Sequence, residues 1–363
     1  MRIFHSRYLP YWLGLAHGFS DGAVGFLLVR LAGDLPIQQA GLLALLYNLL
    51  AFGVQPAIGW LLDRTRSLRP GLVLGLGLSA AALPLAAVQP TLAVCCAGLG
   101  SAGLHAAGGG LALLSTPGKA SGPGLFAAPG VLGLALGAGL ASGQTPIWPA
   151  LAALLAWLLL GLAWMALGQA RRPSETGTDH QPVLPGISGY EWALILLVGA
   201  YSLRSAVWTT FQLFLEGVSP AIPLVSAAAA VGKLLGGLLA DRIGWRRWGV
   251  TTLALAALLL SAGAVDLEWG PSTWLLLAGV TLLQSSLPVM LAWLGQALPR
   301  HPATAASLGL GLATLLGGLP LLAGFVPGFS QPLLALLATL LAALALWIAA
   351  KAPPFQPRAQ AML

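Results

Sequence analysis

The fold is decided by the stretch GWLLDRTRSLR at residues 59–69, because a similar stretch, GLLADRIGWRR, returns at residues 237–247. In both places an apolar run of helical length ends at Gly-x-x-x-Asp-Arg and continues as a short basic loop. An aspartate beside an arginine at the end of an apolar helix is costly to place in a membrane, so its recurrence indicates an internal duplication. A chance likeness of two helix ends does not explain why Gly, Asp and Arg recur in the same order.

The composition is that of an integral membrane protein. Of the 363 residues, 58% are hydrophobic and 7% are charged, and the mean hydropathy is +0.86. Soluble proteins carry roughly a quarter of charged residues. At about 20 apolar residues per span, the length accommodates roughly twelve helices. The sequence therefore predicts an all-α membrane protein without a soluble domain, which we do not expect to be an enzyme.

Twelve apolar runs follow one another along the chain, and the longest polar segment separates the sixth from the seventh. This pattern predicts an N-terminal six-helix half at 1–169, a cytoplasmic linker at 170–188, a C-terminal six-helix half at 189–350 and a cytoplasmic tail at 351–363. The runs lie at residues 10–31, 39–62, 71–89, 91–114, 122–143, 147–169, 189–215, 221–241, 249–265, 272–298, 304–325 and 332–350.

The basic residues predict the orientation of these spans. With the N-terminus in the cytoplasm, 14 of the 17 Lys and Arg residues fall on the cytoplasmic side, and such a bias sets membrane topology. Only Arg30 falls in an outer loop, while Arg204 and Lys233 lie within spans. We therefore expect a multi-pass protein of the bacterial inner membrane with both termini cytoplasmic. The net charge of +7 is a topology signal and does not indicate nucleic-acid binding.

No cofactor, metal or nucleotide site is expected. Cys95 and Cys96 are adjacent within an apolar run, so they have neither metal-ligand spacing nor the geometry for a stabilising disulfide. The run at 108–110 is Gly-rich but lacks the Gly-Lys-Ser/Thr of a phosphate-binding loop. The sequence therefore offers no site at which ATP would bind.

Twelve spans in two halves, with Gly-x-Leu-x-Asp-Arg after spans two and eight, resemble the major facilitator superfamily. The second copy also has Gly244 in its turn, where the first copy has Arg66. The resemblance implies that each aspartate binds the start of a helix in the opposite half, and that these contacts close the protein on its cytoplasmic side. The residues of this conformational latch are Asp63, Arg64, Asp241 and Arg242.

Shorter patterns resemble two branches of that superfamily. HGFSD at residues 17–21 and GLGSAGLH at residues 98–105 are similar to the fosmidomycin-resistance exporters. The fifth span, with Pro129 followed by Gly130 and Gly133, is similar to the Gly-Pro-x-x-Gly stretch of drug/proton antiporters, although Gly-rich packing also explains it. We expect the helices that contain Pro56, Pro129 and Pro288 to bend.

Ionisable residues inside spans are candidates for proton coupling. His17 and Asp21 are spaced i, i+4 and share a helix face, where the carboxylate favours a protonated imidazole. We predict His17, Asp21 and His105 as the proton-coupling residues. A pair that only locks two helices together, and a buried histidine with satisfied hydrogen bonds, are the structural alternatives.

The predicted substrate site combines a cation with aromatic and amide side chains. Tyr201, Arg204 and Trp208 form a stripe on span seven, which suits an anion beside apolar groups, although such stripes are often core packing. Lys233, eight residues before Asp241, is predicted either to pair with Asp21 or to bind an anion. The remaining predicted members are Asn48, Gln55, Gln212 and Gln284.

These residues predict a proton-coupled secondary active transporter of a small organic anion or amphiphilic drug-like molecule. It would work by alternating access of the two halves around a midplane site, driven by a gradient, with export preferred over uptake. The expected partners are a small-molecule substrate, protons and the bilayer, and the superfamily resemblance implies a monomer. A facilitator-fold assembly factor or receptor without transport, and a uniporter, are the alternatives.

Overall fold

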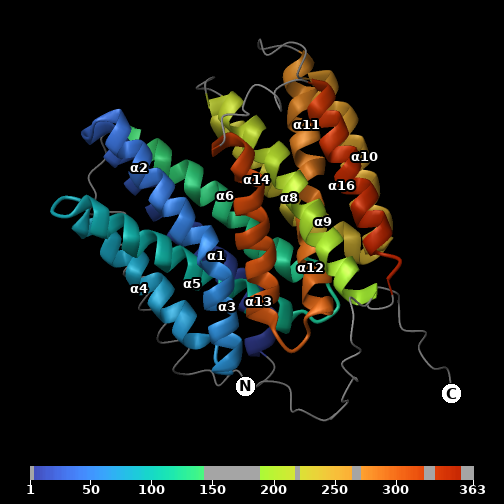
Figure 1. Ribbon diagram of the computed structural model, residues 1–363, viewed down its shortest axis with the longest axis horizontal. Helices are drawn as coiled ribbons and strands as arrows, with labels where there is room; N and C mark the ends of the chain where they lie inside the picture. Colours follow the sequence, from blue (N-terminus) through green and yellow to red (C-terminus); the bar gives the residue numbers. More distant parts are fainter. Residues whose placement is uncertain (1–3, 143–188, 217–220, 264–270, 323–331, 353–363) are drawn as a thin grey trace.

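A computed structural model of the chain describes residues 4–142, 189–216, 221–263, 271–322 and 332–352. Within these ranges every regular element is a helix. Figure 1 shows two groups of helices side by side, one from the chain before residue 143 and one from the chain after residue 188. The all-α architecture predicted from the apolar runs is confirmed.

The helices of the first group match five of the predicted spans in order. The second of these spans is divided into three segments by a short π-helix. The elements are α1 (Phe4–Asp34), α2 (Ile37–Asn48), η1 (Leu49–Gly53), α3 (Gln55–Arg64), α4 (Arg69–Leu85), α5 (Pro90–Ser115) and α6 (Ser121–Ser142). The predicted span 147–169 and the predicted linker 170–188 lie outside the described residues.

The helices of the second group match the six remaining spans, of which the span at 272–298 is divided in two and the span at 304–325 in three. The elements are α8 (Gly189–Glu216), α9 (Ala221–Ile243), α10 (Trp245–Gly263), α11 (Pro271–Ser285), α12 (Leu287–Ala297), α13 (Pro302–Ser307), η2 (Leu308–Ala313), α14 (Thr314–Leu322) and α16 (Pro332–Ala349).

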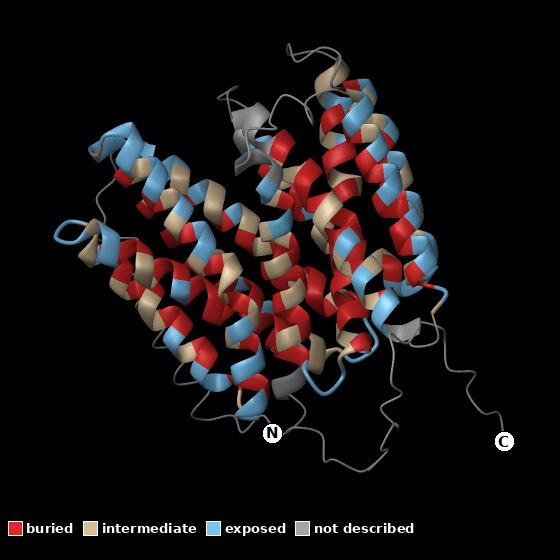
Figure 2. Ribbon diagram, viewed as in Figure 1, coloured by how far each residue is buried: buried red, intermediate tan, exposed pale blue. Residues whose placement is uncertain are grey.

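The described part of the chain contains nine helical stretches long and apolar enough to cross a membrane, and α4 is a shorter apolar helix. Figure 2 shows buried residues in the interior of each group and exposed residues on the outer faces. Many exposed side chains are large and apolar, among them Leu136 and Trp274. A chain with this pattern is a multi-pass membrane protein, because such faces are stable against lipid. The count of twelve helices stays a prediction.

Two of the three predicted proline bends coincide with breaks in a helix. Pro56 lies in the first turn of α3, after η1, and Pro288 lies in the first turn of α12, after the break at Ser286. Proline is favoured at the first helical position because it has no N–H to leave unpaired. Pro129 lies inside α6, which continues through it as one helix.

Glycines hold α1 against α6 at backbone contact. A Cβ atom at Gly14 or Gly25 would collide with a backbone carbonyl of α6, and one at Gly133 would collide with the carbonyl of Gly18. Small residues allow this approach, which drives helix association in membranes. The contact fixes the position of the polar face of α1 relative to α6.

Candidate functional site

The two duplicated aspartates bind the starts of helices from the opposite group. Asp63, at the end of α3, is buried and accepts hydrogen bonds from the Ala303 amide at 3.2 Å and from the Thr304 amide and hydroxyl, both at 2.8 Å. Asp241, at the end of α9, accepts from the Ala120 and Ser121 amides at 2.7 and 3.1 Å. Each carboxylate therefore meets the unpaired N–H groups at a helix N-terminus.

The arginines of the duplicated motif do not join these contacts. Arg64 lies over the Trp60 ring, with its Cζ 5.2 Å from the ring centroid, and Arg242 is exposed. Neither Arg64 nor Arg242 forms an ion pair with Asp63 or Asp241. Asp241 instead accepts a third hydrogen bond from the Trp245 indole at 3.0 Å.

Both turns that follow the aspartates require a left-handed residue. Gly244 has φ of 103°, and Arg66 at the corresponding position of the first copy has φ of 55°. Glycine adopts this region without steric cost, whereas other L-residues do not. The first turn therefore keeps the shape of the second in spite of the arginine.

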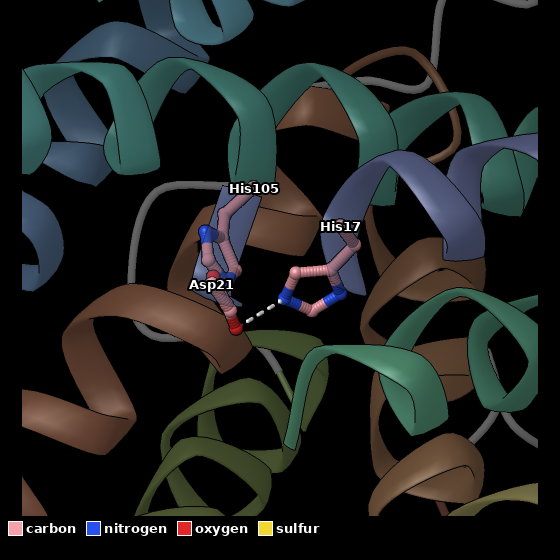
Figure 3. A group of neighbouring side chains, drawn as sticks. All are labelled: His17, Asp21 and His105. Carbon is pink, nitrogen blue, oxygen red and sulfur yellow. Dashed lines mark ion pairs between the residues drawn. The ribbon is translucent and has the colours of Figure 1, made fainter. Parts of the chain in front are cut away.

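The predicted proton-coupling residues form one cluster (Figure 3). His17 and Asp21, both on α1, lie with His17 Nε2 3.0 Å from Asp21 Oδ2. His105 of α5 packs edge-on against His17, with the ring centroids 4.5 Å apart. His17 also stacks on Phe126 of α6 at 4.6 Å. Three helices thus bring two imidazoles and one carboxylate together in the interior.

Backbone carbonyls fix the Nδ1 atoms of both imidazoles. His17 Nδ1 donates to the Phe126 carbonyl at 2.9 Å, and His105 Nδ1 donates to the Ser101 carbonyl at 2.8 Å. Because a carbonyl only accepts, Nδ1 carries hydrogen in each ring, and Nε2 is an acceptor when the ring is neutral. In that tautomer His17 Nε2 faces the Asp21 carboxylate acceptor to acceptor.

One additional proton resolves this conflict. It either makes His17 an imidazolium that donates to Asp21, or sits on Asp21 and is donated to His17. Although 3.0 Å apart, the two atoms are not aligned as a hydrogen bond, and Asp21 Oδ1 has no hydrogen-bond partner among the described residues. In either arrangement the two atoms would share a single proton.

The space around the pair is set by a glycine of α6. A Cβ atom at Gly130 would lie 2.8 Å from Asp21 Oδ2 and closer still to the His17 ring.

The ligand atoms of His17, Asp21 and His105 lie within 4.8 Å of one another, a donor set that also suits a divalent cation. Since His17 and Asp21 contact each other directly, the arrangement fits a shared proton.

A second polar group lies between α8 and α11. Arg204 is 2% exposed, and its guanidinium donates to the Leu283 carbonyl at 3.4 Å and to the side-chain oxygen of Gln284. Its Cζ lies 5.9 Å from the Tyr201 ring centroid. The Tyr201 hydroxyl and the Gln284 side-chain nitrogen have no hydrogen-bond partner among the described residues. Arg204 therefore has only neutral acceptors there.

Lys233 of α9 connects the two polar groups. Its Nζ donates to the Ala127 carbonyl of α6 at 3.4 Å, and the predicted direct ion pair with Asp21 is not formed. The adjacent Gly232 packs against Gln284, where an added Cβ would lie 3.0 Å from the Gln284 Cβ.

The other predicted substrate residues are spread over the two groups. Gln55 is fully buried against Gly311 of η2, and its amide atoms have no partner among the described residues. Trp208 is half-buried against the core. Asn48 is exposed and donates to the Ala44 carbonyl of its own helix at 2.8 Å. The side chain of Gln212 lies outside the described residues.

The sequence analysis did not identify the residues that orient this site. The Phe126 carbonyl holds His17 and Ser101 holds His105, whereas the buried Ser307 hydroxyl has no partner within the described ranges. Tyr47 donates to the Ser101 hydroxyl at 3.3 Å. The π-helices η1 and η2, which contact each other, have no local sequence signal.

Comparison with known proteins identifies the fold. No protein-family model matches the chain, and no curated protein matches it. Among solved structures, the chain is similar to a variant of the E. coli fucose:proton symporter FucP, with a TM-score of 0.70, 16% identity, and 96% of this chain and 98% of that one covered. It is also similar to FucP, a major facilitator superfamily transporter, in the outward conformation, with a TM-score of 0.73, 16% identity, and 96% and 99% covered.

These likenesses establish an all-α protein with the major facilitator fold. The matched proteins are transporters and not enzymes. At 16% identity this likeness establishes the fold alone, and it indicates neither a substrate nor a direction.

Proposed function

We propose that this protein is a proton-coupled secondary active transporter that works by alternating access. Its substrate would be a small organic anion or amphiphilic drug-like molecule, with export preferred over uptake. It would act as a monomer in the bacterial inner membrane, with both termini cytoplasmic. The subfamily we propose is that of the fosmidomycin-resistance exporters, on the motifs at residues 17–21 and 98–105.

One observation carries the proposal. In the buried pair of His17 and Asp21, the histidine Nε2 faces a carboxylate oxygen, and neither atom carries a hydrogen when the imidazole is neutral and the carboxylate is ionised. His17 is 4% exposed, and its Nε2 has no aligned hydrogen-bond partner among the described residues. An unneutralised charge within a span costs about 2.5–3.5 kcal/mol on insertion scales. Such a group is retained where it moves a proton or substrate, and the fold is one that a fucose:proton symporter uses.

The two aspartate contacts support a conformational latch. Both lie at the end of the molecule where the basic loops gather, and both are formed in this structure. We therefore assign this conformation to the state closed on the cytoplasmic side. The likeness to FucP in its outward conformation is consistent with this assignment.

The proton role is tested by flux in liposomes. The purified protein is reconstituted with a pH-sensitive dye inside, and a substrate candidate is added outside. We expect wild type to move protons with the substrate, and Asp21→Asn and His17→Ala to lose at least about 90% of this flux, since general acid–base groups are worth about 100-fold or more when removed.

Asp34→Asn is the matched control, because it makes the same change on the same helix at a side chain that is 62% exposed. It should keep wild-type flux. Equal proton flux in wild type and Asp21→Asn would overturn the assignment of the proton site. Substrate flux without proton movement would indicate a uniporter, and stable co-purification of a partner without any flux would indicate an assembly factor or receptor.

A further inference from the structure

The polar group around Arg204 is buried and has the hydrogen-bond donors of an oxyanion site. Arg204, Tyr201 and Gln284 are 2%, 1% and 0% exposed, so none of them is solvated from outside. A buried guanidinium is stable when it is paired with a carboxylate or phosphate. Within the described ranges Arg204 has only the Leu283 carbonyl and the Gln284 side-chain oxygen, which are both neutral.

The unpaired atoms of this group are donors. The Tyr201 hydroxyl has a hydrogen to donate and the Gln284 side-chain nitrogen has two, and neither atom finds an acceptor in the described part of the chain. An unpaired buried donor is costly. Three buried donor groups without an anionic acceptor in the described part of the chain suit an oxyanion as ligand.

The charge at Arg204 indicates which class of oxyanion fits. Arg204 is the cation whose hydrogen bonds form this group, whereas the Lys233 ammonium donates to the Ala127 carbonyl of α6. A single cation matches a monoanion better than a dianion, and a guanidinium binds a planar carboxylate through two parallel hydrogen bonds.

We propose that Arg204, Tyr201 and Gln284 bind the carboxylate of a small organic monocarboxylate. In this conformation the Gln284 side-chain oxygen accepts the guanidinium hydrogen bond that the ligand carboxylate would accept. An arriving carboxylate displaces that oxygen, and the freed amide then donates to the carboxylate. This inference rests on the proposed transport function, of which it names the substrate class.

The first test measures binding without transport. The melting temperature of the purified protein is followed against hexanoate, benzoate and an N-acetyl amino acid, each beside its uncharged amide and its phosphonate analogue. A ligand that binds only the folded protein raises this temperature. We expect saturable stabilisation by at least one carboxylate and none by its amide. An absence of stabilisation by all the carboxylates, or an equal response to the phosphonates, would overturn the class.

Variants then locate the site. Arg204→Gln should weaken carboxylate binding about 10- to 100-fold and Tyr201→Phe about 2- to 10-fold, as expected for a charged and a neutral hydrogen bond. Arg30→Gln makes the same substitution as Arg204→Gln at a partly exposed side chain and should leave binding unchanged. If Arg204→Gln does not fold, Tyr201→Phe keeps the ring and carries the test. Unchanged affinity in a folded variant would contradict the site.

Gln284→Glu gives the sharpest result. It replaces the neutral stand-in with a carboxylate of nearly the same shape, which should pair with Arg204. We expect this variant to melt at a higher temperature than wild type without ligand, and to show no further rise with the carboxylate. A variant that still binds the carboxylate as wild type does would overturn the proposed displacement. Binding that depends on Arg204 without any flux would leave this site standing and overturn the transport function instead.

Discussion

At the scale of single residues, backbone conformation and backbone atoms set the shape of the turns and of the His17–Asp21 pair. Arg66 occupies a left-handed turn that its counterpart fills with Gly244. Gly130 leaves the room in which His17 meets Asp21, and the Phe126 carbonyl fixes the tautomer of His17. The chemistry of the pair therefore depends on backbone atoms of α6 as much as on its own side chains.

The turn at Arg66 predicts a gain in stability. A non-glycine residue in the left-handed region costs about 1–2 kcal/mol, so Arg66→Gly should stabilise the protein by about 1 kcal/mol. The melting temperature of the purified protein should rise by a few degrees. Gly244→Ala, the reciprocal change, should lower it. A fall in melting temperature for Arg66→Gly would show that the arginine side chain stabilises the turn more than its backbone strain costs.

The single residues also show how much of the candidate site could be predicted from the sequence. His17, Asp21, His105, Arg204 and Gln284 stand out because each is polar in an apolar span, so they could be predicted as members of a site. Their partners could not, because the Phe126 and Ser101 contacts are made by backbone carbonyls, which every residue carries. Which polar residues meet depends on the crossing of α1, α5 and α6, and one sequence does not define that crossing.

At the scale of elements, α6 links the latch to the proton pair. Asp241 binds the amides of Ala120 and Ser121 at its start, and the Phe126 carbonyl one and a half turns further on accepts from His17. Lys233 donates to the next carbonyl, that of Ala127. A movement of α6 that releases Asp241 would therefore also disturb His17 and Lys233.

The latch predicts a change in access to the seam between α3 and α13. A carboxylate at a partly buried helix N-terminus is worth up to about 2 kcal/mol, so Asp63→Asn should increase opening about tenfold or more. The measurement is the rate of maleimide labelling at Ser307→Cys, a fully buried position beside Gly59, with Cys95 and Cys96 replaced by alanine.

Asp34→Asn serves as the control for that labelling rate, because Asp34 lies far along α1 from the latch residues in sequence and is exposed. It should label as slowly as the parent. Equal rates for Asp63→Asn and the parent would show that the hydrogen bonds to Ala303 and Thr304 do not hold the seam closed.

At the scale of the whole molecule, the order of the described spans and their division into two groups were predictable, because membrane helices can be recognised from their length and hydropathy. The duplicated motif indicated two copies, and its aspartates lie at helix starts of the opposite group. The interruptions η1 and η2 were not predictable, since a π-helix inserts one extra residue without a fixed sequence pattern. They occur where the spans from the two groups contact each other.

The central claim is that the His17–Asp21 pair couples proton movement to alternating access. It is tested most directly by electron-paramagnetic distance measurement between spin labels in liposomes. One label pair is placed at Lys119 and Arg247, on the proposed cytoplasmic side, and the other at Ile37 and Leu333, on the opposite side, all exposed positions. When the buffer is changed from acidic to alkaline, we expect the two distances to change in opposite directions in wild type, and to be independent of pH in Asp21→Asn. Distances that respond to pH equally in both proteins would contradict the account.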